Sequence, residues 1–141
     1  MLLTIGYEGG DLPELVERLQ SARVATVVDV RLTPSSRRPG FSKRRLADGL
    51  AGGGIGYEHA PELGNPRDNR AALRAGREPA RARFVAQLEG PARPVVARLA
   101  GRAMGERLAL LCFERAPATC HRSLVAAAMQ AAAPSLTIED L

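Results

Sequence analysis

Aromatic residues are scarce in this sequence: its 141 residues include two tyrosines, three phenylalanines and no tryptophan. Because 45% of the residues are hydrophobic, the core must be built mainly from leucine, valine, isoleucine and alanine. The charged fraction of 25% is close to that of globular proteins, so intrinsic disorder is not the default expectation. A chain of this length buries roughly two thirds of its unfolded surface. We therefore expect a single domain over residues 1–141.

Cysteines and long apolar runs are also few. Two cysteines are too few for a disulfide scaffold, and no run approaches the ~20 apolar residues of a membrane span. The first apolar run, residues 1–5, ends at once in Gly6, which is unlike a signal peptide. We expect a cytoplasmic protein with reduced thiols and no membrane partner.

Acidic residues are outnumbered by basic ones, 15 against 20, which gives a net charge of +5 and a sequence pI of about 10.2. A basic protein favours anionic partners such as nucleic acid, nucleotides or phosphorylated metabolites. Nearly all the positive charges are arginines in an alanine- and glycine-rich chain, and a high-GC genome produces the same composition. Charge alone therefore leaves the partner open.

Short apolar runs alternate with segments of helical periodicity along the chain. This alternation predicts a Rossmann-like α/β domain of three layers, with a mostly parallel five-stranded sheet and helices on both faces. The polar residues 60–78 are expected to form a long loop. The expected strands are residues 2–5, 24–30, 55–59, 108–113 and 135–138, and the expected helices are residues 11–19, 42–50, 79–89, 91–103 and 120–133.

Polar side chains follow the expected strands at the ends where ligands bind in open parallel sheets. Both histidines and both cysteines of the chain lie at this edge. That convergence predicts a functional pocket there. Its first members, in chain order, are Tyr7, Asp29, Arg31, His59, Glu62 and Glu114.

The triplet Cys120-His121-Arg122 is expected to open the last helix. A helix amino terminus, together with His121 and Arg122, would lower the pKa of the Cys120 thiol. The triplet could then provide a thiolate nucleophile or an anion-binding helix start, with His121 as acid or base. Alternatively, Cys120 is a small half-buried filler and His121 a capping residue.

A metal site is a further alternative. Zinc accepts the set Cys112, Cys120, His59 and His121. However, the usual closely spaced cysteine or histidine pairs are missing. We therefore expect no metal and no cofactor.

Residues 34–43 form a proline-rich basic loop. Arginine side chains grip phosphate in a forked geometry, and an aromatic ring stacks on a base. The alternative is a solvated loop with Phe41 anchored in the core. No Walker-type phosphate loop is present. The candidate ligand-binding residues of this loop are Ser36, Arg37, Arg38, Phe41 and Lys43.

Several acidic and aromatic candidates have a structural alternative as well. Asp29 and Arg31 are two apart on a strand and face the same side, so they could form a buried ion pair that orders the loop, or Asp29 could position a substrate group or a histidine. Glu62 and Glu114 could act as acid or base, or simply pair with arginines. Tyr7 could stack on a ligand or pack beneath the loops.

Several short motifs follow one another along the chain. In order, they are Thr4-Ile5-Gly6-Tyr7, Asp29-Val30-Arg31, Pro34-x-Ser36-Arg37-Arg38 with Phe41-x-Lys43, Tyr57-x-His59 with Glu62-Leu63-Gly64, and Leu111-Cys112-x-Glu114 followed by Cys120-His121-Arg122. Together these motifs resemble the bacterial domain-of-unknown-function 488 family. The resemblance runs from about residue 3 to residue 138, and it implies one compact α/β domain with its site at the motif residues. It implies no activity.

The leading hypothesis is an enzyme that acts on a phosphate-bearing substrate, either a nucleotide or nucleic acid. The expected catalytic residues are Cys120, His121, Asp29 and Glu114. The other hypothesis is a nucleic-acid-binding or nucleotide-sensing module without catalysis. The expected ligand-binding residues are Tyr7, Arg31, Ser36, Arg37, Arg38, Phe41, Lys43, His59, Glu62 and Arg122.

Overall fold

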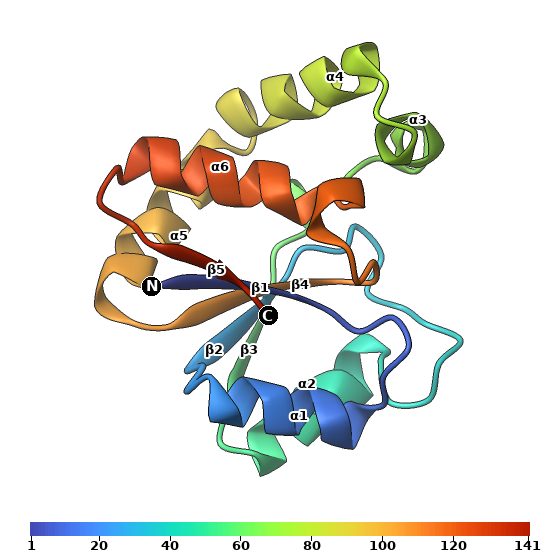
Figure 1. Ribbon diagram of the computed structural model, residues 1–141, viewed down its shortest axis with the longest axis vertical. Helices are drawn as coiled ribbons and strands as arrows, with labels where there is room; N and C mark the ends of the chain where they lie inside the picture. Colours follow the sequence, from blue (N-terminus) through green and yellow to red (C-terminus); the bar gives the residue numbers. More distant parts are fainter.

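The computed structural model describes residues 1–141 and contains one five-stranded sheet in which all strands are parallel (Figure 1). This confirms the predicted fold class. The strand order is β3-β2-β4-β1-β5, so β4 lies in the centre between two strands that precede it in the chain. The strands are β1 (Leu2–Gly6), β2 (Thr26–Asp29), β3 (Gly56–His59), β4 (Leu108–Cys112) and β5 (Ile138–Asp140).

Helices cover both faces of the sheet (Figure 1). Helices α1 (Leu12–Ser21) and α2 (Lys43–Gly52) lie on one face. Helices α5 (Arg93–Gly105) and α6 (Arg122–Ala132) lie on the other, and α4 (Glu78–Glu89) packs on α6. None of the helices has the length and the apolar character needed to cross a membrane.

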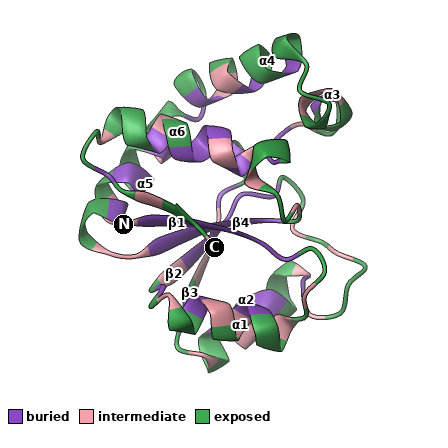
Figure 2. Cartoon of the chain, in the orientation of Figure 1, coloured by how far each residue is buried: buried purple, intermediate pink, exposed green.

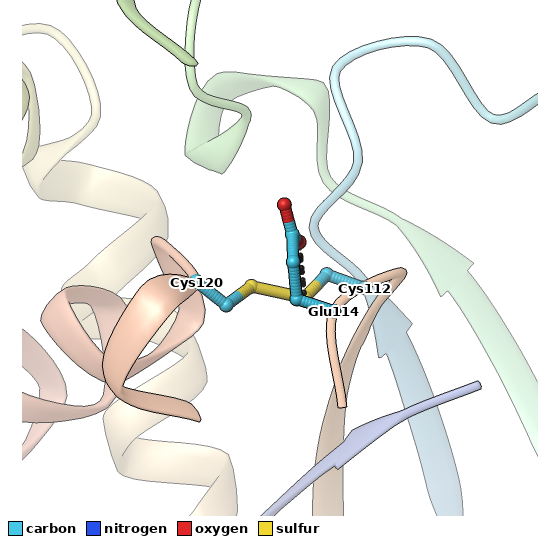
Figure 3. A group of neighbouring side chains, drawn as sticks. All are labelled: Cys112, Glu114 and Cys120. Carbon is cyan, nitrogen blue, oxygen red and sulfur yellow. Dashed lines mark hydrogen bonds between the residues drawn. A yellow bond between two sulfur atoms is a disulfide. The ribbon is translucent and has the colours of Figure 1, made fainter. Parts of the chain in front are cut away.

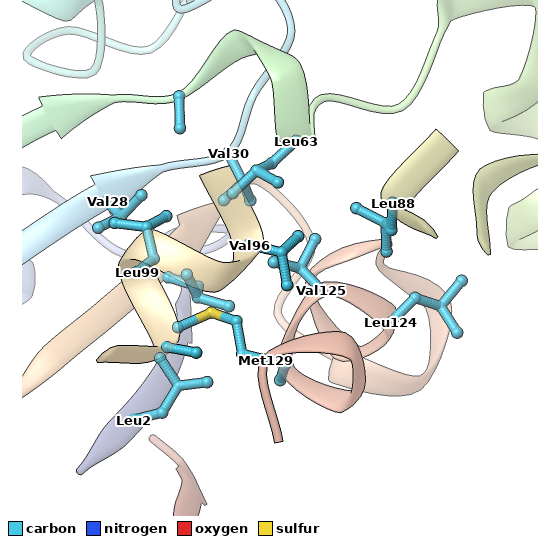
Figure 4. Packing of buried hydrophobic residues seen from close by; sticks show 14 of the residues in the cluster. Leu2, Val28, Val30, Leu63, Leu88, Val96, Leu99, Leu124, Val125 and Met129 are labelled. Atoms are coloured by element: carbon cyan, nitrogen blue, oxygen red, sulfur yellow. The ribbon is translucent and has the colours of Figure 1, made fainter. Parts of the chain in front are cut away.

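Alternating strand side chains divide the core into two hydrophobic layers, one on each face of the sheet. Successive strand residues point to opposite faces. Val27 therefore packs beneath α1 and α2, whereas Val28 packs with α5 and α6 (Figure 4). The central strands β1 and β4 are buried along their whole length (Figure 2). Such strands need helices on both sides, which explains the three layers.

The segment between β3 and α4 differs from the long loop that the sequence predicts. It contains the short helix α3 (Arg70–Arg74) and two 3-10 turns, η1 (Pro61–Leu63) and η2 (Arg67–Asn69). A buried side-chain amide holds them together, because Asn69 donates to the Asn65 side chain and to the Ala80 carbonyl, both at 3.0 Å. The polar composition of this segment gave no indication of these short helical turns.

The last two elements also begin later than expected. The 3-10 turn η3 (Pro117–Thr119) is followed by Cys120, which has an extended backbone, so the helix α6 begins only at Arg122. After α6, the Leu136 amide donates to the Ala133 carbonyl in a turn, so β5 starts at Ile138 rather than at residue 135. Cys120 therefore precedes the helix that it was expected to open.

Gly6 brings the end of β1 against the loop that follows β4. A Cβ atom at this position would lie 1.9 Å from the backbone oxygen of Glu114. Only a glycine allows this approach, since a backbone carbonyl cannot turn away as a side chain would.

Replacing Gly6 with alanine should destabilise the fold by at least about 2 kcal/mol, because overpacking must push two backbone segments apart. Gly101→Ala is the matched control. Gly101 lies in α5 with no atom near the added methyl group, and the change should stabilise the helix by up to about 1 kcal/mol. Denaturant unfolding of both variants measures the difference. Equal stabilities would contradict the close approach.

Candidate functional site

A cavity of about 280 Å³ lies at the carboxyl ends of β1, β2 and β4. This is the sheet edge at which the sequence predicts a pocket. The cavity brings together segments that are up to about a hundred residues apart in the chain. Five residues expected at the site line it: Tyr7, Arg31, Ser36, Glu114 and His121.

A buried ion pair between Asp29 and Arg31 lies next to this cavity, and its Arg31 side is part of the lining. Arg31 Nε donates to Asp29 Oδ1 at 2.9 Å, and Nη2 donates to Oδ2 at 2.7 Å. Oδ1 also accepts the Arg31 amide, and Oδ2 accepts the Tyr57 hydroxyl at 2.6 Å. With Asp29 completely buried and both oxygens occupied, the carboxylate holds structure together and is not placed to accept a substrate proton.

The Nη1 group of Arg31 is also occupied. Nη1 donates to the Phe41 carbonyl at 2.7 Å and to the Tyr7 hydroxyl at 3.2 Å. Burial by itself lowers the pKa of Arg31, but the hydrogen bonds and the charge of Asp29 outweigh burial and leave the pKa raised. Arg31 is thus a permanent cation that ties β1, β2 and the following loop together.

Tyr7 and Phe41 pack as a stacked pair, with ring centroids 4.3 Å apart and an interplanar angle of 9°. The Phe41 ring is completely buried, so it cannot stack on a nucleobase from solvent. This outcome matches the alternative in which Phe41 anchors the loop. Tyr7 lines the cavity, but its ring and hydroxyl are both engaged by protein.

The other basic residues of this loop lie outside the cavity. Arg37 and Lys43 are exposed, and Arg38 Nη2 donates to the Gly10 carbonyl. Ser36 alone of the expected loop residues lines the cavity. Its carbonyl accepts the Ser42 hydroxyl at 3.3 Å, which keeps the loop folded back toward α2.

Two candidates that follow β3 do not line the cavity. His59 Nε2 lies 2.8 Å from the Arg31 carbonyl, and because a carbonyl only accepts, the ring donates this bond. His59 therefore helps to position the loop after β2. Glu62 is exposed on η1 and lies outside the lining residues.

Arg122 is completely buried beneath the loop between β4 and α6. Its Nη1 contacts Cys112 Sγ at 3.0 Å and donates to the Glu114 carbonyl, while Nη2 donates to the Arg115 carbonyl at 2.9 Å. Burial lowers the pKa of Arg122. As the first residue of α6, it directs its side chain back into the preceding loop, so it holds backbone carbonyls and does not face a ligand.

His121 occupies the N-cap position of α6 without a side-chain capping bond. Its Nε2 lies 2.8 Å from the Val30 carbonyl, so Nε2 carries the hydrogen and Nδ1 of the neutral ring is free to accept. Burial lowers the pKa of His121, which leaves the ring neutral near pH 7. Nδ1 lies 3.8 Å from Cys120 Sγ.

Cys112 and Cys120 are joined by a disulfide (Figure 3). The expectation of reduced thiols, and of Cys120 as a free nucleophile, is therefore wrong for this state of the chain. The physical reason is topological, because the loop after Cys112 returns so that Cys120 faces the end of β4. At the start of α6, the Ser123 and Leu124 amides donate to the Cys120 and His121 carbonyls and are not free to bind an anion.

A metal does not fit the disulfide state. Cys112, Glu114 and Cys120 place possible ligand atoms within 4.8 Å of one another. However, sulfurs bonded to each other are not thiolate ligands, and the Arg122 cation already contacts Cys112. His59, which belonged to the ligand set suggested by the sequence, is hydrogen-bonded to the Arg31 carbonyl instead.

Sequence reasoning missed Arg70 and Arg74, which line the cavity from α3. Arg74 pairs with Glu114 at 2.8 Å, whereas Arg70 forms no ion pair. Their spacing could have indicated them, because Arg70 and Arg74 are four residues apart and would lie on the same side of a helical turn that also carries Leu73.

Asp29→Asn should destabilise the protein by about 3 kcal/mol, because it leaves the Arg31 charge buried without its partner. Asp68→Asn breaks an exposed pair with Arg83 and is the matched control, with no measurable change expected. Denaturant unfolding compares the two. Equal effects would show that burial does not decide the contribution of the pair.

Because of His121, the free energy of unfolding should decrease as the pH falls below 6.5, the ordinary pKa of a histidine. Its pKa in the folded protein is lowered, so the unfolded chain takes up the proton first and the folded state loses stability as the pH falls. His121→Gln, which keeps a donor but cannot titrate, should show a shallower loss between about pH 6.5 and pH 5. Parallel stability curves for the two proteins would contradict this assignment.

One protein-family model matches residues 11–129, and this family is described as a domain of unknown function, DUF488. The match runs from the cap of α1 into α6 and includes every cavity-lining residue except Tyr7. No curated protein and no solved structure matches the chain. The resemblance that the sequence motifs indicate is confirmed, and the chain belongs to the DUF488 family.

Proposed function

We propose that this protein binds a small phosphate-bearing ligand, of the nucleotide class, in the cavity at the carboxyl ends of the strands. The observation that carries the proposal is Arg70, a cation that lines the cavity and forms no ion pair. The other two lining arginines are matched, since Arg31 pairs with Asp29 and Arg74 with Glu114. Three guanidinium groups thus meet two carboxylates, and the excess positive charge favours an anion.

The rest of the lining suits phosphate oxygens. Hydroxyl groups come from Thr33, Ser35, Ser36 and Thr119, and Asn65 adds a side-chain amide. These groups donate hydrogen bonds, which phosphate oxygens accept. The cavity therefore offers directional donors around the unmatched charge.

Phe113 is the ring best placed for a nucleobase. It lines the cavity and is 40% exposed, and it packs against the Tyr7 ring in a T-shaped arrangement with the ring centroids 5.4 Å apart. Stacking on an exposed aromatic face is a common and sequence-tolerant way to hold a base. In this proposal, Phe113 and not Phe41 stacks on the base.

The size of the cavity favours a small molecule over a polymer. At about 280 Å³ it lies near the lower end of the roughly 300–1,000 Å³ range of small-molecule pockets. The basic residues that would track a nucleic-acid backbone, Arg37 and Lys43, lie outside it. We therefore propose a free nucleotide, and not a nucleic acid, as the ligand of a cytoplasmic protein.

Acid–base chemistry on the bound ligand is the second candidate, and it retains the enzyme hypothesis. Glu114 and His121 both line the cavity, and the lowered pKa of His121 keeps a neutral base there at pH 7. Of the Cys-His-Arg triplet, only His121 lines this cavity, so a reaction would pass through the imidazole rather than the thiol.

Arg70→Gln should weaken nucleotide binding about tenfold or more, because a charged hydrogen bond to phosphate contributes about 1.5–3 kcal/mol. Calorimetric titration with ATP, AMP and inorganic phosphate measures the affinity, and the loss should shrink as salt is raised. Arg23→Gln removes one exposed charge at the opposite edge of the sheet and should bind like the wild type.

Two results would contradict the proposal. One is the absence of binding for all three ligands. The other is equal weakening by Arg70→Gln and Arg23→Gln, which would reduce the effect to net charge. An oligonucleotide affinity that depends on Arg37 but not on Arg70 would favour the nucleic-acid-binding module instead.

A further inference from the structure

We propose that the Cys112–Cys120 pair is a redox-active site that exchanges with a small thiol carrying carboxylate groups. This goes beyond ligand binding in the first cavity, and neither depends on the other. The disulfide stands between two cavities. Cys112 lines the first, and Cys120 lines a second cavity of about 220 Å³ between α4 and the start of α6.

The second cavity gives an external thiol a route to Cys120. Cys120 is 3% exposed and Cys112 is 1% exposed, so neither lies on the open surface. A thiol that enters the second cavity meets Cys120 together with Thr119 and Ser123. Attack on Cys120 makes Cys112 the leaving group, and exchange is faster when the leaving thiolate is stabilised.

Arg122 provides that stabilisation. Its Nη1 lies 3.0 Å from Cys112 Sγ, and a neighbouring guanidinium favours the thiolate form. The Glu114 carboxylate, 3.6 Å from the same sulfur, acts in the opposite direction (Figure 3). Arg74 pairs with this carboxylate, so two guanidinium groups face one carboxylate around Cys112.

His121 supplies the proton acceptor for the other sulfur. Val30 holds the hydrogen on Nε2, so Nδ1 is unprotonated and lies 3.8 Å from Cys120 Sγ. When the pair is reduced, the Cys120 thiol can donate to Nδ1, and loss of its proton regenerates the attacking thiolate. The two cysteines thus have different neighbours, with a base beside Cys120 and a cation beside Cys112.

The exchange balances as two thiolate attacks. The external thiolate bonds to Cys120 Sγ, the S–S bond breaks, and the electron pair leaves on Cys112. A second external thiolate then attacks the external sulfur of the mixed disulfide and releases Cys120 as a thiolate. Two external thiolates are oxidised to one disulfide, and the protein disulfide takes up two electrons. The reverse reaction needs an external disulfide as the oxidant.

Charge in the second cavity indicates the class of thiol. Arg77 and Arg81 line it, are exposed, and form no ion pair. Glu78 is the one acidic residue among the lining residues. The excess of positive charge favours a thiol with carboxylates, such as glutathione, over a cationic one.

A redox titration of the wild-type protein tests the proposal directly. The native protein is equilibrated in mixtures of glutathione and glutathione disulfide, quenched with an alkylating agent, and its modified thiols are counted by mass spectrometry. We expect both thiols to appear and disappear together, with a two-electron dependence on the mixture. Thiols that react only after unfolding would overturn the proposal.

Substrate choice and the site of attack need two further measurements. The rate of oxidation by glutathione disulfide, divided by that by cystamine, should fall at least about threefold in Arg81→Gln and stay unchanged in Arg23→Gln. Cys112→Ser should retain a mixed disulfide with glutathione on Cys120, whereas Cys120→Ser should leave Cys112 unmodified.

Three outcomes would overturn the proposal. They are an unchanged rate ratio in Arg81→Gln, a stable mixed disulfide on Cys112 in Cys120→Ser, and a stoichiometric metal on the reduced protein that protects both thiols from oxidation. The titration uses the wild-type chain, so the proposal stays testable even if a cysteine variant fails to fold. Nucleotide titrations of the same samples report on the first cavity separately.

Discussion

The ion pair between Asp29 and Arg31 is the interaction on which the architecture of the site depends. A carboxylate and a guanidinium buried together are tolerated only when nearly every hydrogen-bonding group has a partner. Here Tyr57, Tyr7 and the Phe41 carbonyl complete the set. As a result, one charged pair fixes the ends of β1 and β2 and the loop that leads to α2. Each buried charge of the pair is held by several hydrogen bonds, which fixes the segments beside the cavity relative to one another.

Arg122 does the same for the other half of the site by a different route. It has no carboxylate partner and instead binds backbone carbonyls of the loop after β4. Its position at the start of α6 ties that loop to the helix, and the Gly6 approach ties it to β1. Arg31 and Arg122, which their positions in the sequence suggest as ligand-binding residues, thus both hold loops of the protein together. The unpaired positive charge that lines the cavity comes from Arg70 in α3, a segment without any recognisable motif.

The sequence predicts the layers and the edge that carries the site, because both depend on patterns that act locally. Runs such as Leu108–Cys112 are apolar on both faces, and that pattern requires covering helices. The sequence identified five of the lining residues, but it could not separate them from candidates such as His59 and Arg122, which do not line the cavity. Arg31 and Arg70 are the same residue type, and their different roles follow from Asp29 and from α3, which are set by tertiary contacts. The start of α6 was misplaced by two residues because Cys120, which follows η3, has an extended backbone and lies outside the helix.

The strand order places severe demands on how the chain assembles. β1 is hydrogen-bonded only to β4 and β5, and β2 only to β3 and β4. The first strand synthesised therefore has no partner until the ribosome has added Leu108 and the residues after it. Until then, β1 and β2 are joined through α1 but not to each other. Insertion of the apolar β4 between them must be the step that unites the sheet, and contacts this distant in sequence form slowly. Until that step, β1 lacks both of the strands to which it is hydrogen-bonded in the folded protein.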